Sequence, residues 1–216
     1  MAWSSGKDSA LALHVLRAAG RYEVAALLTT VTAGYDRVSM HGVRRELLER
    51  QAAAIGLSLD VVSIPQDCSD ELYRARMRAA MEKHRAAGVA AVAFGDLFLE
   101  DVRAYRLANL APLGLEAVFP LWGRNTAELA EEFIAAGFRA VVTCVDTRAI
   151  AAAFAGREFD RQFLADLPAD ADPCGEKGEF HSFAYAGPIF RAPLAIRVGA
   201  KVLRDGRFQF CDVLPA

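Results

Sequence analysis

The sequence predicts an α/β protein in which a doubly wound parallel sheet is followed by a smaller C-terminal α+β lobe. Over the first two thirds of the chain, short apolar runs alternate with amphipathic stretches. The apolar runs are nearly continuous, which is typical of parallel strands that helices cover on both faces. After about residue 160 the apolar runs become shorter and lie between turns, which indicates antiparallel strands. We therefore expect two units, at residues 1–118 and 119–216.

The strands of both units can be placed from these runs. An apolar stub at residues 1–3 comes first; because a polar turn begins at residue 4, the first strand is either trimmed or starts upstream of Met1. Further buried strands are expected at 24–31, 59–64, 90–94, 117–119 and 140–145. The antiparallel strands are expected at 180–185, 194–198, 201–204 and 207–212. Asp205-Gly206 is a favourable two-residue hairpin turn between the last two.

Helices are expected where apolar residues recur with the helical period of about 3.6 residues. They cover residues 9–19, 43–55, 70–87 and 127–136, and another follows Gly95-Asp96 and ends at Leu110. Ser69 or Asp70 is a candidate N-cap for the helix at 70–87, and Thr126 is a candidate for the helix at 127–136.

Composition limits the class of protein. The chain has 216 residues, of which 54% are hydrophobic and 24% are charged, and this excludes intrinsic disorder. No apolar run approaches the roughly 18 residues that a bilayer span requires, and the N-terminus is unlike a signal peptide. The four cysteines form no C-x-x-C pair, so we expect a soluble protein of the reducing cytoplasm, with no membrane partner. The net charge of −2 makes nucleic acid an unlikely partner.

A polar loop follows the first apolar stub and opens the first helix, at Ser4-Ser5-Gly6-Lys7-Asp8-Ser9. Ligands of open α/β sheets bind at this place, the carboxyl end of a strand. Small residues let the backbone approach an anion, and the free N–H groups of a helix start can cradle phosphate oxygens. The loop is neither a Walker A sequence nor a GxGxxG sequence. A simple serine-rich turn with a helix cap is the competing interpretation.

This loop resembles the SGGxDS pyrophosphate loop of the ATP pyrophosphatase (PP-loop) superfamily, whose domain is HUP/Rossmann-like, with Ser5 in place of the first glycine. Further segments resemble the diphthine–ammonia ligase (diphthamide synthase) family, and they are TAGYDRVSMHGV at 32–43, FGDLFLEDVR at 94–103, DPCGEKGEFHSF at 172–183 and GPIF at 187–190. The resemblance extends to about residue 190. Only four of the 25 basic residues are lysine, a bias that indicates a G+C-rich genome and a bacterial-type member.

The resemblance implies an ATP-dependent carbon–nitrogen ligase. Such an enzyme adenylates an acceptor carboxylate, releases pyrophosphate and uses ammonia to form an amide, with Mg²⁺ bound beside the phosphates. Two alternatives stay open: a PP-loop sulfur-transfer enzyme that uses Cys144 or Cys174, and a non-catalytic adenine-nucleotide-binding protein. The acceptor, which a protein could carry, is not predicted, because a bacterium would have no diphthine. The second unit is too small for a glutaminase, so ammonia arrives free or from a partner. The oligomeric state is not predicted.

The resemblance also implies the nucleotide-binding residues, which are Ser4, Ser5, Gly6, Lys7, Asp8, Ser9, Thr29, Thr30, Gly95, Asp96, Arg103 and Arg106. Asp8 is the candidate Mg²⁺ ligand, with closure of the turn as the alternative. Lys7 pairs with phosphate unless it is a solvated loop lysine. Arg103 and Arg106 are three residues apart and share a helix face, where they bind an anion or remain solvated. Relatives usually have a glutamate just after these arginines, whereas this chain has leucine and alanine.

The C-terminal unit contributes a second group of candidates, Glu176, Glu179 and His181. Glu179 and His181 are two apart on an expected strand and so share a face. Carboxylates beside a histidine suit deprotonation of ammonia or acceptor binding. Lys7 and Asp8 complete the catalytic set, and a salt-bridged turn is the competing interpretation. The cysteines lack the spacing of a zinc site, so buried structural roles are expected for them.

Overall fold

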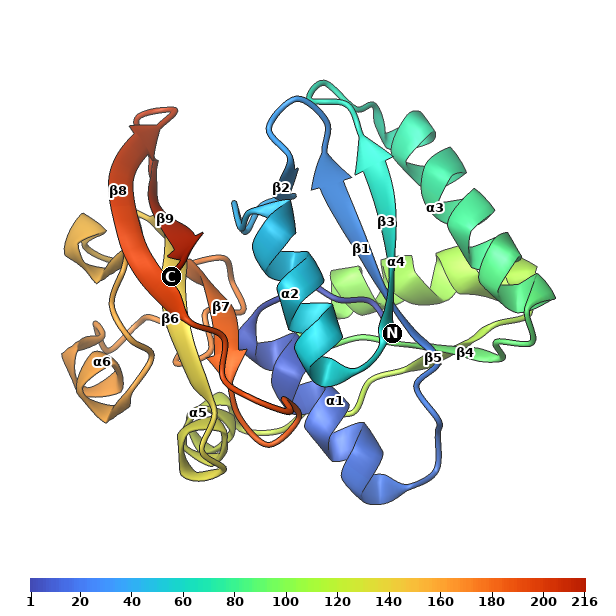
Figure 1. Ribbon diagram of the computed structural model, residues 1–216, viewed down its shortest axis with the longest axis horizontal. Coiled ribbons are helices and arrows are strands. Elements are labelled where there is room, and N and C mark those ends of the chain that lie inside the picture. Colours follow the sequence, from blue (N-terminus) through green and yellow to red (C-terminus); the bar gives the residue numbers. More distant parts are fainter.

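The computed structural model describes all 216 residues (Figure 1). The strands are β1 (Ala26–Thr32), β2 (Arg37–Val38), β3 (Ser58–Ile64), β4 (Ala91–Ala93), β5 (Glu116–Val118), β6 (Arg139–Asp146), β7 (Phe180–Ala186), β8 (Ile196–Arg204) and β9 (Phe208–Pro215). The helices are α1 (Lys7–Ala19), α2 (Arg45–Ile55), α3 (Asp70–Ala86), α4 (Glu100–Leu110), α5 (Thr126–Ala135) and α6 (Arg161–Asp166), with single 3₁₀ turns at Ala111–Leu113 and Ala152–Phe154.

The strands of the N-terminal half are parallel, apart from the two-residue β2, which pairs antiparallel with the end of β1. β1 pairs with β3 over its full length, and β4 pairs with β5, in both cases in parallel. Residues 1–3 lie between these two pairs and connect them by backbone hydrogen bonds. The Ala2 amide donates to the Ala93 carbonyl at 2.9 Å, and the Trp3 amide donates to the Leu28 carbonyl at 2.8 Å. The apolar stub is therefore the centre of a sheet with the order β3, β1, residues 1–3, β4, β5.

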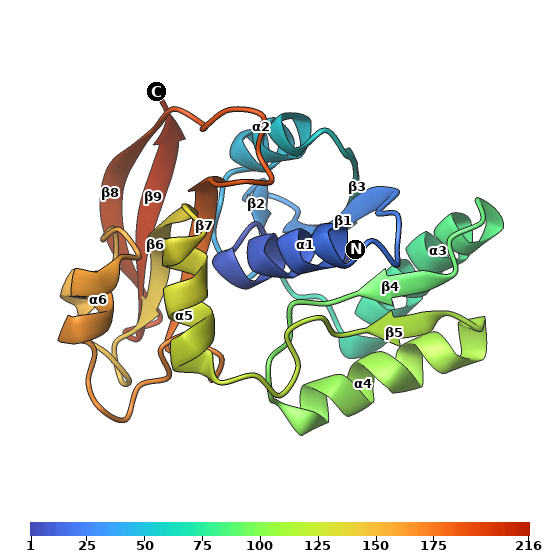
Figure 2. The same cartoon turned by 90° about the horizontal axis from the view of Figure 1, so that it is seen from below.

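Helices cover both faces of this sheet, as a doubly wound fold requires. Figure 2 shows α1 and α2 on one face and α3 and α4 on the other. The smaller apolar core, which includes Met81 of α3 and Leu110 of α4, lies under the second pair of helices. The larger core lies under α1 and α2 and continues into the C-terminal half, where it includes Phe163 and Phe183. The predicted α/β class is confirmed.

The C-terminal half is a separate antiparallel sheet with the strand order β7-β6-β9-β8. Asp205 and Gly206 form the predicted hairpin turn with φ angles of 52° and 59°. The two strands predicted at 194–198 and 201–204 are one strand, β8, because a register shift between Val198 and Lys201 lets the chain pass through an irregularity without ending. Thr126 does not cap α5; the Asn125 side chain does, accepting from two amides of the first turn at 2.9 and 3.1 Å.

A buried amide joins the two halves. Gln51 of α2 is fully buried, and its Oε1 accepts from the Trp3 indole N–H at 2.6 Å. Its Nε2 donates to the Ser5 carbonyl at 3.0 Å and to the Ala184 carbonyl of β7 at 2.6 Å. One side chain thus connects the central strand, the polar loop and the second sheet. The division at residues 118 and 119 stays a prediction.

An ion-pair cluster also crosses between the halves. Asp212 of β9 accepts from Arg37 at 2.8 Å and from Arg44 at 2.6 and 3.1 Å. Burial alone would raise the pKa of Asp212, but these hydrogen bonds outweigh burial and lower it to about 2. The charge of this carboxylate therefore stabilises the fold above about pH 4, and that contribution is lost as the pH falls towards 2.

We expect Asp212→Asn to lower the free energy of unfolding by about 1–2 kcal/mol at pH 7, since the arginines are partly solvated. The difference between variant and wild type should shrink as the pH falls below about 4, because the wild type loses the same charge. Urea unfolding at several pH values measures it. Glu49→Gln removes an exposed i,i+4 pair with Arg45 and serves as a control, with an expected cost below about 0.5 kcal/mol. An equal cost for both would contradict the assignment.

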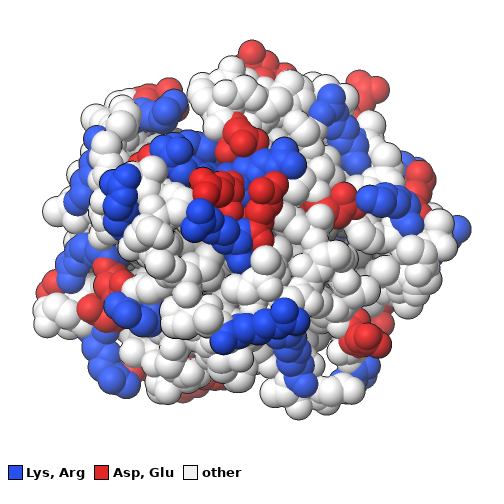
Figure 3. All heavy atoms as spheres, viewed as in Figure 1, with Lys and Arg blue, Asp and Glu red and all other residues white.

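Two surface properties bear on partners. No helix is long and apolar enough to span a bilayer. On the face in Figure 3, acidic and basic side chains are interspersed.

Candidate active site

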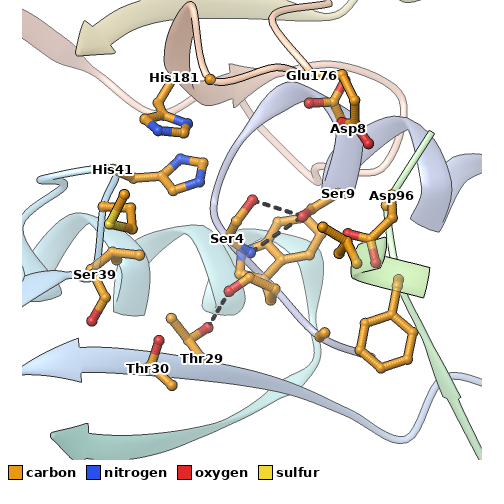
Figure 4. A pocket seen from close by; sticks show the side chains of 18 of the residues that line it. Ser4, Asp8, Ser9, Thr29, Thr30, Ser39, His41, Asp96, Glu176 and His181 are labelled. Carbon is orange, nitrogen blue, oxygen red and sulfur yellow. Dashed lines mark hydrogen bonds between the residues drawn. The ribbon is translucent and has the colours of Figure 1, made fainter. Parts of the chain in front are cut away.

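A cavity of about 360 Å³ opens at the carboxyl ends of the parallel strands. Its walls are the polar loop, the ends of β1 and β4, and the segment from Gly175 to Ser182 (Figure 4). The predicted site residues that line it are Ser4, Lys7, Asp8, Ser9, Thr29, Thr30, Gly95, Asp96, Arg106, Glu176 and His181. The structure therefore brings the two groups of candidates, from opposite ends of the chain, to one cavity.

The polar loop is closed by its own hydroxyls. Ser4 Oγ lies 2.9 Å from Ser9 Oγ, which also accepts from the Ser4 amide at 3.2 Å. The Lys7 amide donates to the Ser182 hydroxyl at 3.2 Å, so β7 supports the loop from the C-terminal side. The amides of Asp8 and Ser9 have no backbone acceptor in the preceding turn. The N-terminus of α1 thus presents free N–H groups and positive potential beside the cavity, as an anion site requires.

Ser5 does not line the cavity. It is buried, its φ is 69°, and its hydroxyl has no hydrogen-bond partner. This left-handed conformation favours glycine, the residue that the resembled motif has here. Gly6 lies behind the loop, where an added Cβ would be 3.2 Å from His41 Cε1 and from the Ser182 carbonyl oxygen. Both residues shape the loop from behind.

We expect Ser5→Gly to raise the free energy of unfolding by about 1 kcal/mol. The change relieves a left-handed conformation and removes a buried hydroxyl without a partner. Urea unfolding measures it. Ser63→Gly, in the extended backbone of β3, should lower stability and is the control. A loss of stability in Ser5→Gly would mean that its hydroxyl finds a partner in solution.

Lys7 and Asp8 form a close pair at the start of α1. Lys7 Nζ lies 2.9 and 2.8 Å from the two carboxylate oxygens of Asp8 and also donates to the Cys174 carbonyl. The side chain of Lys7 is only 4% exposed and packs near the rings of Phe159 and Phe180. Burial alone would lower the pKa of Lys7, but the Asp8 carboxylate outweighs it and raises that pKa, so the ammonium stays charged. Lys7 is therefore not a solvated loop lysine; it holds Asp8 in place.

Glu176 lies on the same side of the cavity as Asp8 (Figure 4). Its Oε1 accepts from the Leu97 amide at 2.7 Å, and its own amide donates to Asp172 at 2.8 Å. Burial, together with the nearby carboxylates of Asp8 and Asp96, raises the pKa of Glu176 to about 7. A carboxyl that exchanges its proton near neutral pH can act as a general base.

Two histidines form the opposite wall. The rings of His41 and His181 lie 4.5 Å apart between centroids, and Figure 4 shows them side by side. Burial and the charge of Lys7 lower the pKa of His181 to about 4, and burial with the neighbouring ring lowers that of His41 well below its usual value. Both imidazoles are neutral at pH 7 and can each donate one hydrogen bond and accept another. His41 is not among the site residues predicted from the sequence, although it lies in the segment at 32–43 that resembles the family.

Glu179 and Arg103 lie outside the cavity. Glu179 is buried within its loop, where its Oε1 accepts from the Asp172 amide at 2.9 Å. It shares no wall with His181, because β7 begins only at Phe180. The Arg103 guanidinium stacks on the Trp122 ring, 4.7 Å from its centroid. The two arginines of α4 therefore point to different surroundings.

The remaining candidates line the cavity, and most of them also contact other parts of the protein. Arg106 forms an ion pair with Asp96 at 3.2 Å. The Thr29 hydroxyl donates to the Trp3 carbonyl at 2.7 Å, whereas Thr30 has no side-chain contact of this kind. At Gly95, an added Cβ would lie 3.0 Å from the backbone at Asp8 and Ser9, so this glycine permits close packing of β4 on α1. Ser182 and Asp172 were missed by the sequence reasoning, since their contacts depend on the fold.

The residues present fit a magnesium ion bound together with phosphates. No group of three His, Cys, Asp or Glu side chains could hold a metal without help from a ligand. The cavity nevertheless has the carboxylates of Asp8, Asp96 and Glu176 in its wall, and both lining cations, Lys7 and Arg106, are already paired. Because Lys7 and Arg106 are paired with Asp8 and Asp96, neither is an unpaired cation for the phosphates of a ligand, and a bound Mg²⁺ would supply that positive charge. Mg²⁺ typically uses one or two carboxylates plus phosphate oxygens and water.

The fold and this cavity define a class: doubly wound α/β proteins with a polar loop between the first strand and the first helix. Models of the diphthamide synthase N-terminal domain and C-terminal domain match residues 1–110 and 125–213. The chain belongs to the diphthamide synthase family.

Two relatives are named for their activity. The diphthine–ammonia ligase of Mus musculus is 24% identical over 192 residues, which cover 81% of this chain and 67% of the relative. That of Homo sapiens is 23% identical over 175 residues, 76% of this chain and 64% of the relative. The chain thus spans about two thirds of the length of these relatives.

Proposed function

We propose that this protein is an ATP-dependent ligase that converts an acceptor carboxylate into an amide with ammonia. The observation that carries the proposal is the meeting of an anion-binding loop, a carboxyl that titrates near pH 7 and two neutral histidines around one cavity. The family and the names of the relatives support it. Diphthine is the acceptor in those names; the acceptor of this chain is to be identified.

The reaction would proceed in two displacements. A carboxylate oxygen of the acceptor bonds to the α-phosphorus of ATP while the bond to the pyrophosphate oxygen breaks. Ammonia then bonds to the acyl carbon, the bond between that carbon and the AMP oxygen breaks, and one proton is released. When bound, Mg²⁺ offsets the negative charge of the leaving pyrophosphate. The amides at the start of α1 would hold phosphate oxygens, with Asp8 held by Lys7 as the candidate metal ligand.

The two histidines and Glu176 would orient the attacking ammonia and accept its proton. The neutral imidazoles of His41 and His181 can accept hydrogen bonds from ammonia and orient its lone pair. Glu176 would take the proton released when ammonia bonds to carbon, because a pKa of about 7 lets it accept and then release that proton at neutral pH.

Sulfur transfer fits this site less well. Burial raises the pKa of both Cys144 and Cys174 to about 12, so both remain thiols at neutral pH. Neither thiol lines the cavity. Since the thiolate is the reactive form, a persulfide or thiolate mechanism lacks its nucleophile here.

The proposal is tested by the products formed from ATP. Purified protein is incubated with Mg²⁺, ATP, ammonium and acceptors that include diphthine and other carboxylates, and phosphorus NMR identifies the products. AMP and pyrophosphate that appear only with both ammonium and acceptor would support a ligase. Steady formation of ADP would contradict it. Tight ATP binding by calorimetry with no AMP under any acceptor would favour the non-catalytic alternative.

A further inference from the structure

A second cavity, of about 210 Å³, lies between α3 and α4 on the face of the sheet away from the C-terminal half. It borders the main cavity, because Tyr73, Met77, Phe94 and Arg106 line both. A ligand in one cavity therefore shares a wall with a ligand in the other. The nucleotide chemistry proposed above makes no use of this second space.

The floor of the second cavity is apolar and its charged groups are all cations. Met81, Leu110 and Leu113 are buried and form the apolar part of the lining. Arg74 and Arg78, four residues apart on α3, face the same space. No Asp or Glu lines this cavity.

The two arginines of α3 are free to bind a ligand. Neither forms an ion pair, in contrast to Arg106, which is paired with Asp96 at 3.2 Å. The Arg74 guanidinium lies over the ring of Tyr105, 5.7 Å from its centroid, an arrangement that leaves its N–H edge free for an anion. An apolar pocket with two unpaired guanidinium groups is complementary to a molecule with an apolar body and an anionic end.

We propose that the second cavity binds the part of the acceptor remote from the reacting carboxylate. That part is an apolar body that ends in an anionic group, which Arg74 and Arg78 hold. The assignment of this ligand as the acceptor rests on the proposed function, whereas the affinity of the cavity for such a molecule does not. The acceptor would then belong to the class of acids with a second, distant anionic group. It would extend from the second cavity into the main cavity alongside Arg106, which lines both.

The methionines provide reporters for each cavity. The chain has four methionines. Met81 lines only the second cavity, Met40 lines only the main cavity, and Met77 lines both. Full-length protein labelled with ¹³C at the methionine methyl groups is titrated with hexanoate, which represents the remote end of the acceptor. Hexan-1-ol has a similar chain without the charge and is the ligand control.

We expect hexanoate to shift the Met81 and Met77 signals and to leave Met40 unchanged. The variant with both Arg74→Gln and Arg78→Gln should bind hexanoate about tenfold more weakly, whereas Arg50→Gln, on the far side of the sheet and paired with Glu46, should bind it as the wild type does. Hexan-1-ol should bind the wild type and the double variant equally and more weakly than hexanoate binds the wild type.

Three results would overturn the proposal: no Met81 shift, a shift of Met40 at lower hexanoate concentration than Met81, or equal binding of hexanoate by wild type and double variant. None of these depends on ATP turnover. Failure of the ligase assay with a normal hexanoate titration would refute the proposed function and leave the anion-binding cavity in place. AMP formation together with a failed hexanoate titration would support the proposed function and refute the anion-binding cavity.

Discussion

Asp8→Asn is expected to lower AMP formation at least 100-fold, because it removes the carboxylate that the Lys7 ammonium fixes at the start of α1. It should also lower the free energy of unfolding by about 2 kcal/mol, since a buried ammonium loses its charged partner and retains only neutral acceptors. Mg²⁺-dependent ATP binding, measured by calorimetry, should weaken as well; this measurement needs no acceptor.

A second variant separates the two effects of Asp8. In Lys7→Met with Asp8→Asn, the buried charge is gone, so much of the lost stability should return. Activity and Mg²⁺-dependent ATP binding should remain low, because the carboxylate is still absent. Wild-type activity in either variant would exclude a catalytic or metal-binding role for Asp8. If the double variant recovered both stability and activity, the pair would be purely structural.

Glu176→Gln is expected to lower AMP formation about 100-fold or more and to remove an inflection near pH 7 from the rate profile. A general base acts in its ionised form, so the wild-type rate should rise with pH through about 7. The histidines cannot produce this inflection, because the pKa of His181 is lowered to about 4 and that of His41 is also well below its usual value. The measurement is the initial rate from pH 5.5 to 8.5 with the acceptor that supports turnover.

The ratio of wild-type to variant rate removes the titration of ammonium itself, which affects both proteins alike. Glu179→Gln is a matched control in the same loop, since its carboxyl is buried outside the cavity. That variant should keep the inflection, with any loss appearing as lower stability. An inflection near pH 7 that persists in Glu176→Gln would assign it to another group.

The sequence predicts the fold well where local signals and the larger pattern agree. Apolar runs locate the parallel strands, and Asp205-Gly206 forms the hairpin turn that its residue types favour. The sequence does not predict a helix start to the exact residue, because two adjacent residues can both be suitable caps: Asn125 caps α5, not Thr126. The central place of residues 1–3 in the sheet depends on hydrogen bonds to Leu28 and Ala93, which no local pattern encodes.

Site residues can be predicted when they lie within one continuous motif, whereas their contacts with distant residues depend on the fold. The loop at residues 4–9 has a continuous motif and could be found, as could Glu176 and His181 within theirs. The period of two along a strand placed Glu179 with His181, but Glu179 precedes β7 and faces its own loop. A phosphate contact for Lys7 is expected from its place in the loop motif and stays a prediction, whereas the contact of its ammonium with both carboxylate oxygens of Asp8 is known only from packing.

The buried amide of Gln51 has a consequence for how this chain can be recombined with its relatives. Its Nε2 donates to the backbone carbonyl of Ser5 in the polar loop and to that of Ala184 in β7, and its Oε1 accepts from the Trp3 indole N–H. In a hybrid assembled from the front half of one relative and the back half of another, Gln51, Trp3 and Ser5 would come from one parent and only the Ala184 carbonyl from the other. Because an unpaired buried N–H is costly, such a hybrid would be stable only if β7 kept its position beside α2.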